Sequence, residues 1–297
     1  MTDVTVIVVN YNTSAEARRC VESAAADLES VRLNAEATGG TAWQAIIIDN
    51  ASSDGPAAQL RGLARTTLVE NARNVGFGAA VNQAVRLSDA PLLWLLNPDC
   101  EVAAGAFAAL ADTLTRHPDC AIAAPQLLNS DGSTQASARG EPDAWTGLFG
   151  RHSLLTKFFP SSSLSRRNLP AADLVTSGVE SAAVDWVMGA AMLMRRDRFD
   201  AVGGFDEGYF MYWEDADLCR RLRARGWRTR YVPRARVAHA GGVSAKRSGA
   251  AAIRAFHDSA YRYYATHVVP QWWHPLRWFA RIALTGRAWW RSRRASR

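Results

Sequence analysis

Several patterns that mark well-known classes of protein are missing from this sequence. The four cysteines lie far apart and form no C-x-x-C pair, which excludes a zinc knuckle and a thioredoxin-type redox motif and predicts reduced, mostly buried thiols. No apolar run approaches the roughly 18 to 20 residues of a membrane-spanning helix. The turn after the first apolar segment has no glycine, and G-x-x-x-x-G-K-[ST] is absent. Nicotinamide and P-loop chemistry are therefore disfavoured.

Acidic residues are absent from the last 27 residues, which hold seven arginines and five tryptophans. These arginines equal the formal net charge of +7, so the rest of the chain is formally balanced. In a helical projection after Pro275, the apolar side chains lie largely opposite the arginines, which predicts an interfacial helix on anionic lipid through residues 272–297. A helix that packs its tryptophans on the core is the alternative. The N-terminus has no basic leader, so we expect a cytoplasmic protein on the inner face of the cell membrane.

Three short apolar segments, at residues 4–9, 45–48 and 92–96, alternate with polar turns and helical stretches. Strands that are apolar on both faces and alternate with helices are typical of a parallel sheet covered on both sides. The predicted fold class is α/β. We expect one α/β domain at residues 1–240 and a basic helical tail at residues 241–297.

Local signals place further elements along the chain. Residues 13–16 have the spacing of a capping box at a helix start. Residues 213–226 predict a helix, with acids in the first turn and a glycine as the stop signal, and residues 230–238 predict a strand. Periodicity fades at residues 129–181. We expect residues 150–181 to form a flexible loop on the acceptor side, that is, on the side of the site where a second substrate would bind.

Polar residues follow the predicted strands. They are Asn10, Asp49, Asn97 and Asp99. Ligands of such sheets bind beyond the carboxyl ends of the strands, so these side chains predict a site at one edge. The carboxylate of Asp49 can accept the imide N–H of a pyrimidine base. Residues 50–54 suit a binding role and an Asx-type turn that caps the next helix equally well. The turn from Asn74 to Asn82 contains two glycines, whose N–H groups can face a phosphate, although a lone G-x-G is often only a tight turn.

A second group of candidates lies in the C-terminal half. Glu214 and Asp215 begin a predicted helix, where acids also suit the macrodipole, and Trp213 belongs to an aromatic stretch that can desolvate them and raise the pKa of a general base. His239 ends a strand and suits a metal or phosphate, although a lone histidine is often structural. Arg139 is a candidate anion clamp.

Six segments together resemble the family 2 glycosyltransferases, and most closely their bacterial rhamnosyltransferase-like branch. They are VVNYN at 8–12, IIIDNASSD at 46–54, NVGFGAAVN at 74–82, NPD at 97–99, GFDEGYFMYWEDADL at 204–218 and HAGG at 239–242. The resemblance covers about residues 4 to 245 in the expected order. It implies a GT-A fold, a nucleotide-diphosphate sugar donor, a divalent metal (Mg²⁺ or Mn²⁺) and inversion at the anomeric carbon.

The resemblance also implies roles for individual residues. Residues assigned to the nucleotide sugar are Asn10, Tyr11, Asp49, Asn74, Gly76 and Asn97. Asp99 matches the second acid of the family's D-x-D metal motif, whose first acid is Asn97 here, and His239 is an auxiliary metal or diphosphate contact. Asp215, with Glu214 beside it, corresponds to the catalytic base, and Arg139 and Trp213 remain candidates for the acceptor or a phosphate.

The function expected from the resemblance is transfer of a sugar, best matched by L-rhamnose from dTDP-β-L-rhamnose, to a hydroxyl of a polyprenyl-diphosphate-linked saccharide in cell-surface polysaccharide synthesis. A UDP-sugar donor, a sugar-nucleotide pyrophosphorylase and a sugar-nucleotide binder without catalysis are alternatives. The arginine tail also admits a nucleic-acid-binding protein, but its tryptophans favour lipid and we expect no nucleic acid. The sequence leaves the acceptor sugar, the linkage and the oligomeric state open.

Overall fold

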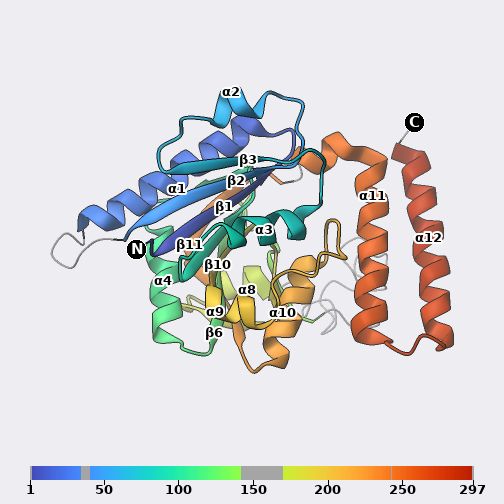
Figure 1. Cartoon of the computed structure of the whole chain (residues 1–297). Coiled ribbons are helices and arrows are strands. Elements are labelled where there is room, and N and C mark those ends of the chain that lie inside the picture. The colour runs from blue at the N-terminus through green and yellow to red at the C-terminus, as the bar shows by residue number, and fades with distance from the viewer. Residues whose placement is uncertain (1, 35–40, 142–169, 242, 296–297) are drawn as a thin grey trace.

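The computed structural model describes residues 2–34, 41–141, 170–241 and 243–295, and its centre is a mixed sheet (Figure 1). The strands are β1 (Val4–Asn10), β2 (Trp43–Asp49), β3 (Thr66–Glu70), β4 (Leu92–Leu96), β5 (Cys100–Val102), β6 (Cys120–Leu128), β7 (Ala138–Arg139), β8 (Ala182–Val184), β9 (Trp186–Val187), β10 (Ala191–Arg195) and β11 (Arg228–His239). The main sheet has the order β3-β2-β1-β4-β10-β6-β11-β5, with β8 beside β11, and β7 pairs with β9 separately.

Most of the helices cover the two faces of this sheet, and the last two pack against each other beside it (Figure 1). The helices are α1 (Ser14–Asn34), α2 (Pro56–Leu60), α3 (Phe77–Arg86), α4 (Ala106–Arg116), α8 (Pro170–Thr176), α9 (Arg196–Ala201), α10 (Glu214–Ala224), α11 (Val243–Tyr263), the π-helical turn η1 (Tyr264–Val268) and α12 (Pro275–Ala295). None of the helices in the described ranges is long and apolar enough to cross a membrane.

The alternation of side chains along β1 explains the two layers of helices. Val4, Val6 and Val8 belong to the core that includes α1 and α4. Ile7 and Val9 belong to the opposite core, with residues of α3, α9 and α10. Because successive side chains of a strand point to opposite faces, a strand that is apolar throughout must be covered twice. This confirms the predicted α/β class.

Strand direction brings several chain segments to one edge. β1, β2, β3 and β4 are mutually parallel, and Asn10 is in register with Asp49. β10 runs antiparallel to β4, so its first residue, Ala191, pairs with Leu96 at the carboxyl end of β4. β11 ends at the same edge, where His239 pairs with Cys100. The polar residues after the strands therefore converge, as predicted.

Helices α11 and α12 form an antiparallel hairpin at one side of the molecule, with α12 outermost (Figure 1). α11 is attached to the loop that precedes α10. Ser259 donates a hydrogen bond to the carbonyl of Met211 at 2.9 Å, and Arg262 pairs with Asp206 at 2.7 Å. The hairpin is thus anchored to the segment that leads into the acidic start of α10.

Two local predictions differ from the structure, and the first concerns which helix the turn after β2 caps. The Thr13 hydroxyl donates to Oδ1 of Asn10, and the carboxylate of Asp54 instead accepts hydrogen bonds from the backbone N–H and the hydroxyl of Ser14 at the start of α1. The turn after β2 therefore caps the preceding helix rather than the next one.

In the segment where periodicity fades, Pro170–Thr176 forms α8, while residues 142–169 of the expected acceptor-side loop lie outside the described residues.

The predicted free thiols are confirmed. Cys20, Cys100, Cys120 and Cys219 are all buried and unpaired with one another.

Candidate functional site

Asn10 and Asp49, at the ends of adjacent strands, hold each other in place. Nδ2 of Asn10 donates to Oδ1 of Asp49 at 2.7 Å, and Oδ2 of Asp49 accepts the backbone N–H of Ser52 at 3.0 Å. Both side chains are buried, and Tyr11 follows half-buried. Since each carboxylate oxygen can accept two hydrogen bonds, Oδ2 retains capacity for another donor.

The turn at Gly76 connects this region with the loop before α10. Gly76 has φ of 90°, and a Cβ there would lie 2.6 Å from the carbonyl oxygen of Phe210. That oxygen accepts the N–H of Phe77 at 2.9 Å, and Oδ1 of Asn74 accepts the N–H of Gly76 at 2.9 Å. The N–H of Gly76, which was expected to face a phosphate, therefore already donates within the protein, and so does the N–H of Phe77. The carbonyl of Gly76 also accepts Nδ2 of Asn50.

Asn97, Asp99 and His239 come together where β4 and β11 end. Nε2 of His239 lies 3.4 Å from Oδ1 of Asp99 and 3.5 Å from Nδ2 of Asn97. Within the described ranges, no further His, Cys, Asp or Glu side chain completes a metal-binding group of three or more with them.

Gln135 determines how His239 is presented. Nε2 of Gln135 donates to the backbone carbonyl of His239 at 2.7 Å, so its Oε1 is the acceptor for Nδ1 of the ring at 2.9 Å. This hydrogen-bond network places a proton on Nδ1 and turns Nε2 toward Asp99, so that in the neutral ring Nε2 carries the lone pair. A carboxylate and a neutral imidazole nitrogen are ligands of divalent cations, and a fixed tautomer is typical of metal-binding histidines. The chemistry of the pair therefore fits a shared cation.

Asp215 lies in the first turn of α10 and is held by backbone amides. Oδ2 accepts the N–H of Gly189 at 2.9 Å, and Oδ1 accepts the N–H of Ala216 at 2.7 Å. Burial raises the pKa of Asp215, while these two amides and the positive charge of Arg139 lower it, and the net direction is upward. The expected desolvation is thus present, and it is moderated by three groups that favour the carboxylate.

Glu214 lies in a different environment although it is adjacent. Burial, followed by the charge of Asp215, raises the pKa of Glu214 well above its ordinary value. Its Oε2 is buried without a hydrogen-bond partner in the described part of the chain, and the same holds for Nε1 of Trp213. Because two interacting carboxyl groups share their titration, the one with more hydrogen-bond donors is the better anion. Asp215 is therefore favoured as the ionised member of the pair.

Aromatic rings enclose the start of α10. Trp213, which has φ of 69° at the helix N-cap, contacts Phe256 and Tyr263 of α11, with ring centroids 6.0 and 5.2 Å away. The guanidinium of Arg139 stacks on Trp186 at 5.1 Å. Positive φ is unfavourable for a tryptophan, and such strain is concentrated at functional sites.

A short turn joins the acidic pair to the His239 cluster. Gly189 binds Asp215, and the next residue, Ala190, accepts the N–H of Asn97 at 2.7 Å. The backbone of Ala240 donates to the carbonyl of Asp99 at 3.1 Å. The structure thus joins the acidic pair and the Asn97–Asp99–His239 cluster along one connected edge.

Comparison with known proteins identifies the family. The family described as glycosyl transferase family 2 matches residues 5–166, and a family described as the N-terminal domain of galactosyltransferase matches residues 181–242. The chain belongs to glycosyl transferase family 2. It is therefore an enzyme, a glycosyltransferase, as the sequence motifs indicated.

Named relatives of this glycosyltransferase include a protein of Mycobacterium tuberculosis, called N-acetylglucosaminyl-diphospho-decaprenol L-rhamnosyltransferase. It is 34% identical over 259 residues, which cover 82% of this chain and 81% of the relative. The rhamnosyltransferase WbbL of Escherichia coli is 44% identical over 82 residues, or 28% of this chain and 31% of the relative.

The fold of the glycosyltransferase has solved counterparts. A mannosyltransferase of Pyrobaculum calidifontis in complex with GDP-Man and Mn²⁺ superposes with a TM-score of 0.57 and 16% identity, covering 99% of this chain and 72% of the other. At this identity the likeness concerns the fold, and it agrees with the predicted GT-A-like architecture.

Two contributors to the site were not identified from the sequence. Gln135 orients His239 from 104 residues away, and Gly189 binds Asp215 from 26 residues away. Gln135 lies where periodicity fades, and Gly189 stands just before β10 without a motif of its own. Neither residue carries a local signal, because its role depends on which strands become neighbours.

Proposed function

We propose that this glycosyltransferase transfers L-rhamnose from dTDP-β-L-rhamnose to a hydroxyl of a saccharide carried on a polyprenyl diphosphate. The name of the mycobacterial relative, which the chain matches over four fifths of both lengths, supports L-rhamnose as the sugar and a polyprenyl-diphosphate-linked saccharide as the acceptor. The observation that carries the proposal is the contact of Asp215 with the Gly189 amide, beside the Asn97–Asp99–His239 cluster. It joins a candidate base to a candidate diphosphate site.

The donor nucleotide is assigned to the edge formed by β1, β2 and α3. Asp49 keeps an acceptor position for the base, and Asn10 fixes its carboxylate. Tyr11, Asn74 and Gly76 border the same region, with Asn97 on the side of the diphosphate.

Asp99 and His239 are the residues that would hold a divalent cation, Mg²⁺ or Mn²⁺. Nε2 of His239 faces the Asp99 carboxylate at 3.4 Å, with Nδ1 held by Gln135, which supports this assignment. A bound cation would supply positive charge to the leaving diphosphate. With Asn97 in place of an acid, the protein contributes less negative charge to the cation, and more of the binding would depend on the phosphates of the donor.

Asp215 is the proposed general base. Its carboxylate takes the proton of the acceptor hydroxyl while that oxygen forms a bond to C1 of the sugar. The bond from C1 to the diphosphate oxygen breaks, and the nucleoside diphosphate leaves with the electron pair. One displacement inverts the configuration at C1, so a β-linked donor gives an α-linked rhamnoside. Glu214, which lacks a donor on Oε2, stays protonated beside it and leaves the charge on Asp215.

Arg139 and Trp213 are assigned to the acceptor side. The charge of Arg139 acts on Asp215, and its guanidinium stacks on Trp186, so a clamp for an acceptor phosphate is within reach of the base. The indole N–H of Trp213 is buried without a partner among the described residues, and it could donate to a sugar hydroxyl only once the acceptor or a side-chain movement uncovers it.

The tail is assigned to the membrane that carries such an acceptor. On α12, Phe279 is 70% exposed and Ile282 is 72% exposed, and all five tryptophans after residue 271 are exposed, so these side chains do not pack on the core. Half-buried Leu284 and buried Ala288 lie on the side toward α11 instead. An aromatic face flanked by arginines suits an anionic bilayer surface. We propose a peripheral enzyme whose residues 241–297 form this membrane module.

The deciding experiment combines binding and turnover. We expect dTDP or UDP with Mg²⁺ to stabilise the wild type and not Asp49→Ala in thermal titrations. With dTDP-β-L-rhamnose and a polyprenyl-diphosphate-linked N-acetylglucosamine, Asp215→Asn should lose roughly 10²- to 10⁴-fold in kcat and still bind dTDP. Full activity of Asp215→Asn would exclude Asp215 as the base, and absence of any nucleotide binding would contradict the donor site.

A further inference from the structure

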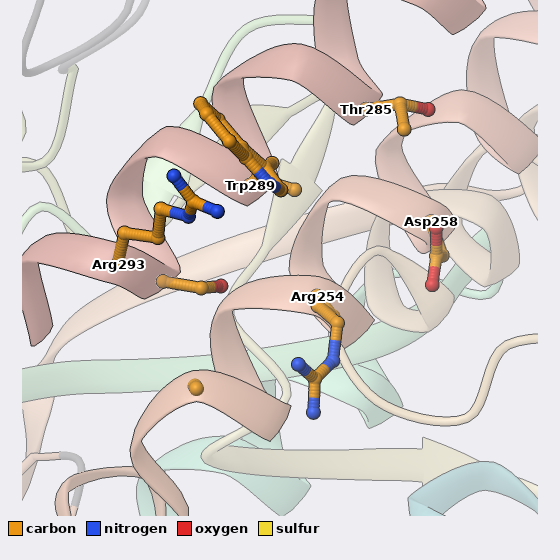
Figure 2. A pocket seen from close by; sticks show the side chains of 8 residues that line it. Arg254, Asp258, Thr285, Trp289 and Arg293 are labelled. Atoms are coloured by element: carbon orange, nitrogen blue, oxygen red, sulfur yellow. The ribbon is translucent and has the colours of Figure 1, made fainter. Parts of the chain in front are cut away.

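A pocket lies in the seam between α11 and α12. Its volume is about 680 Å³. The polar and aromatic side chains that line it are Arg254, Asp258, Thr285, Trp289, Ser292 and Arg293, most of which are labelled in Figure 2. It is a feature of the tail hairpin and is formed by none of the residues assigned to catalysis.

The pocket and the catalytic residues lie on opposite sides of α11. Phe256 contacts Trp213, which directly precedes the acidic pair. Arg254 and Asp258 are each two residues from Phe256 and therefore about 200° around the helix from it. Since an α-helix with its side chains is roughly 10 Å across, a ligand in the pocket is separated from the reacting acceptor by the body of α11.

Positive charge dominates the surroundings of the pocket. Arg254 and Arg293 line it, against one lining carboxylate, Asp258. Burial lowers the pKa of His257 of α11, and the nearby charges of Arg287 and Arg291 of α12 lower it further. The described part of α12 contains no acidic residue. The seam is therefore suited to a phosphate, for which arginine offers paired N–H donors.

The polar groups differ from one end of the pocket to the other. Figure 2 shows Arg293 at one end of the pocket, Asp258 and Thr285 at the other, and Arg254 between them. The Arg293 guanidinium stacks on the exposed ring of Trp289, 4.0 Å from the ring centroid. Trp290 and Phe279, which are also exposed, belong to the same helix. A ligand that matches this order has a phosphate, hydroxyl groups beyond it and a hydrocarbon part beside the aromatic face.

We propose that this pocket binds the headgroup of an anionic phospholipid, with the phosphate at Arg254 and Arg293 and headgroup hydroxyls at Asp258 and Thr285. The inference rests on the proposed membrane function of the hairpin and adds a defined lipid site to it. Acyl chains would lie along the aromatic face of α12. The lipid-linked acceptor does not occupy this pocket, because α11 stands between the pocket and Asp215.

Calorimetric titration with dihexanoyl phosphatidylglycerol below its critical micelle concentration tests the site without a bilayer. The probes for comparison are dihexanoyl phosphatidylcholine and inorganic phosphate. The test variant is Arg254→Gln with Arg293→Gln. The control, Arg281→Gln with Arg294→Gln, also removes two positive charges, both from positions of α12 that do not line the pocket. Thermal unfolding of both double variants verifies that they are folded.

We expect saturable binding of the phosphatidylglycerol to the wild type and the control, and binding at least about 10-fold weaker in the Arg254/Arg293 variant. Equal weakening in both variants would indicate diffuse charge attraction and overturn the proposal. Binding of phosphatidylcholine or inorganic phosphate as strong as that of the anionic lipid would also overturn it. Titration of dTDP in the same samples keeps the two proposals apart, since loss of dTDP binding concerns the transferase site alone.

Discussion

At the scale of single residues, the environment separates two adjacent carboxyl groups that the sequence presents as a pair. Asp215 accepts hydrogen bonds from the amides of Gly189 and Ala216, whereas Oε2 of buried Glu214 accepts none from the described residues. Hydrogen bonds to a carboxylate favour its charged form, and burial without them favours the protonated form. The chemical roles proposed for the two residues follow from this difference.

The charge of Arg139 provides a first test. It lowers the pKa of Asp215, which burial raises. If ionised Asp215 is the base, activity falls as the pH drops through its pKa. Arg139→Gln removes the positive charge, so we expect the acid limb of the kcat–pH profile to move to higher pH. Arg139→Lys keeps the charge, and its acid limb should stay near that of the wild type. The same position of the limb in all three proteins would contradict the link between Arg139 and the base.

Glu214 provides a second test, on stability. Its pKa is raised in the folded protein, so the folded state binds this proton more tightly than the unfolded chain. The stabilisation is full below the unfolded pKa of about 4.3 and is lost as the pH rises toward the folded pKa, by about 1.4 kcal/mol per unit. Glu214→Gln has no charge to lose, so its Tm relative to the wild type should rise between about pH 4.5 and 8.

The control for this measurement is Glu101→Gln, which removes an exposed carboxylate from β5. We expect its Tm difference from the wild type to change little over the same pH range. A flat difference for Glu214→Gln as well would show that this carboxyl group is solvated in solution.

At the scale of elements, the turn before α3 and the loop before α10 depend on each other. Gly76 approaches the Phe210 carbonyl so closely that a Cβ would lie 2.6 Å from its oxygen. Phe77 donates its N–H to this same oxygen. Ser259 and Arg262 of α11 hold the same loop from the other side. The start of α10 is therefore positioned by two elements that are distant in sequence.

Gly76→Ala tests this coupling. Gly76 has φ of 90° and Gly105, at the N-cap of α4, has φ of 80°, but nothing lies within 4 Å of a Cβ at Gly105. Gly105→Ala should therefore cost only the roughly 1 to 2 kcal/mol of a left-handed alanine. Gly76→Ala combines the clash with Phe210 and a backbone conformation, φ of 90° and ψ of 168°, that side chains adopt even less readily, so we expect a larger loss of stability and weaker dTDP binding, measured by thermal unfolding with and without nucleotide. Equal losses in the two variants would contradict a role for the close contact.

At the scale of the whole molecule, the hairpin presents an aromatic surface while remaining attached to the edge that carries the proposed active site. The contact of Phe256 with Trp213 links α11 to the first turn of α10, and α12 packs on the outer side of α11 (Figure 1). If α12 docks on a bilayer, the same anchor holds the site in a fixed relation to the membrane surface. This would bring a membrane-carried acceptor to Asp215 without a spanning helix.

The aromatic face can be tested apart from the lipid pocket. Phe279→Ser with Ile282→Ser removes two exposed apolar side chains, each worth about 1.5 to 3 kcal/mol when buried. We expect binding to phosphatidylglycerol–phosphatidylcholine vesicles, measured by sedimentation, to weaken by about 100-fold or more. Leu87→Ser, at an exposed position after α3, is the matched control and should bind as the wild type. Unchanged binding of the double variant would contradict the proposed docking face.

A sequence signal predicts only the structure that depends on residues close to it in the chain. Apolar segments with polar ends are local, and they were sufficient to predict β1, β2, β4 and β11 and the convergence of Asn10, Asp49, Asn97 and Asp99. The acidic start of α10 and its stop at Gly226 are local in the same way. The motifs then placed the chain in its family, because their order and spacing are properties of the sequence.

Tertiary structure alone decided which groups orient and ionise these residues. The tautomer of His239 depends on Gln135, and the charge of Asp215 depends on Gly189 and Arg139, all from other strands or from the turns beside them. It also decided that Asp54 caps the helix before it and that α12 turns its aromatic side outward. A hydrogen-bond partner is selected by which strands become neighbours in the sheet, and no local pattern of residues records that choice.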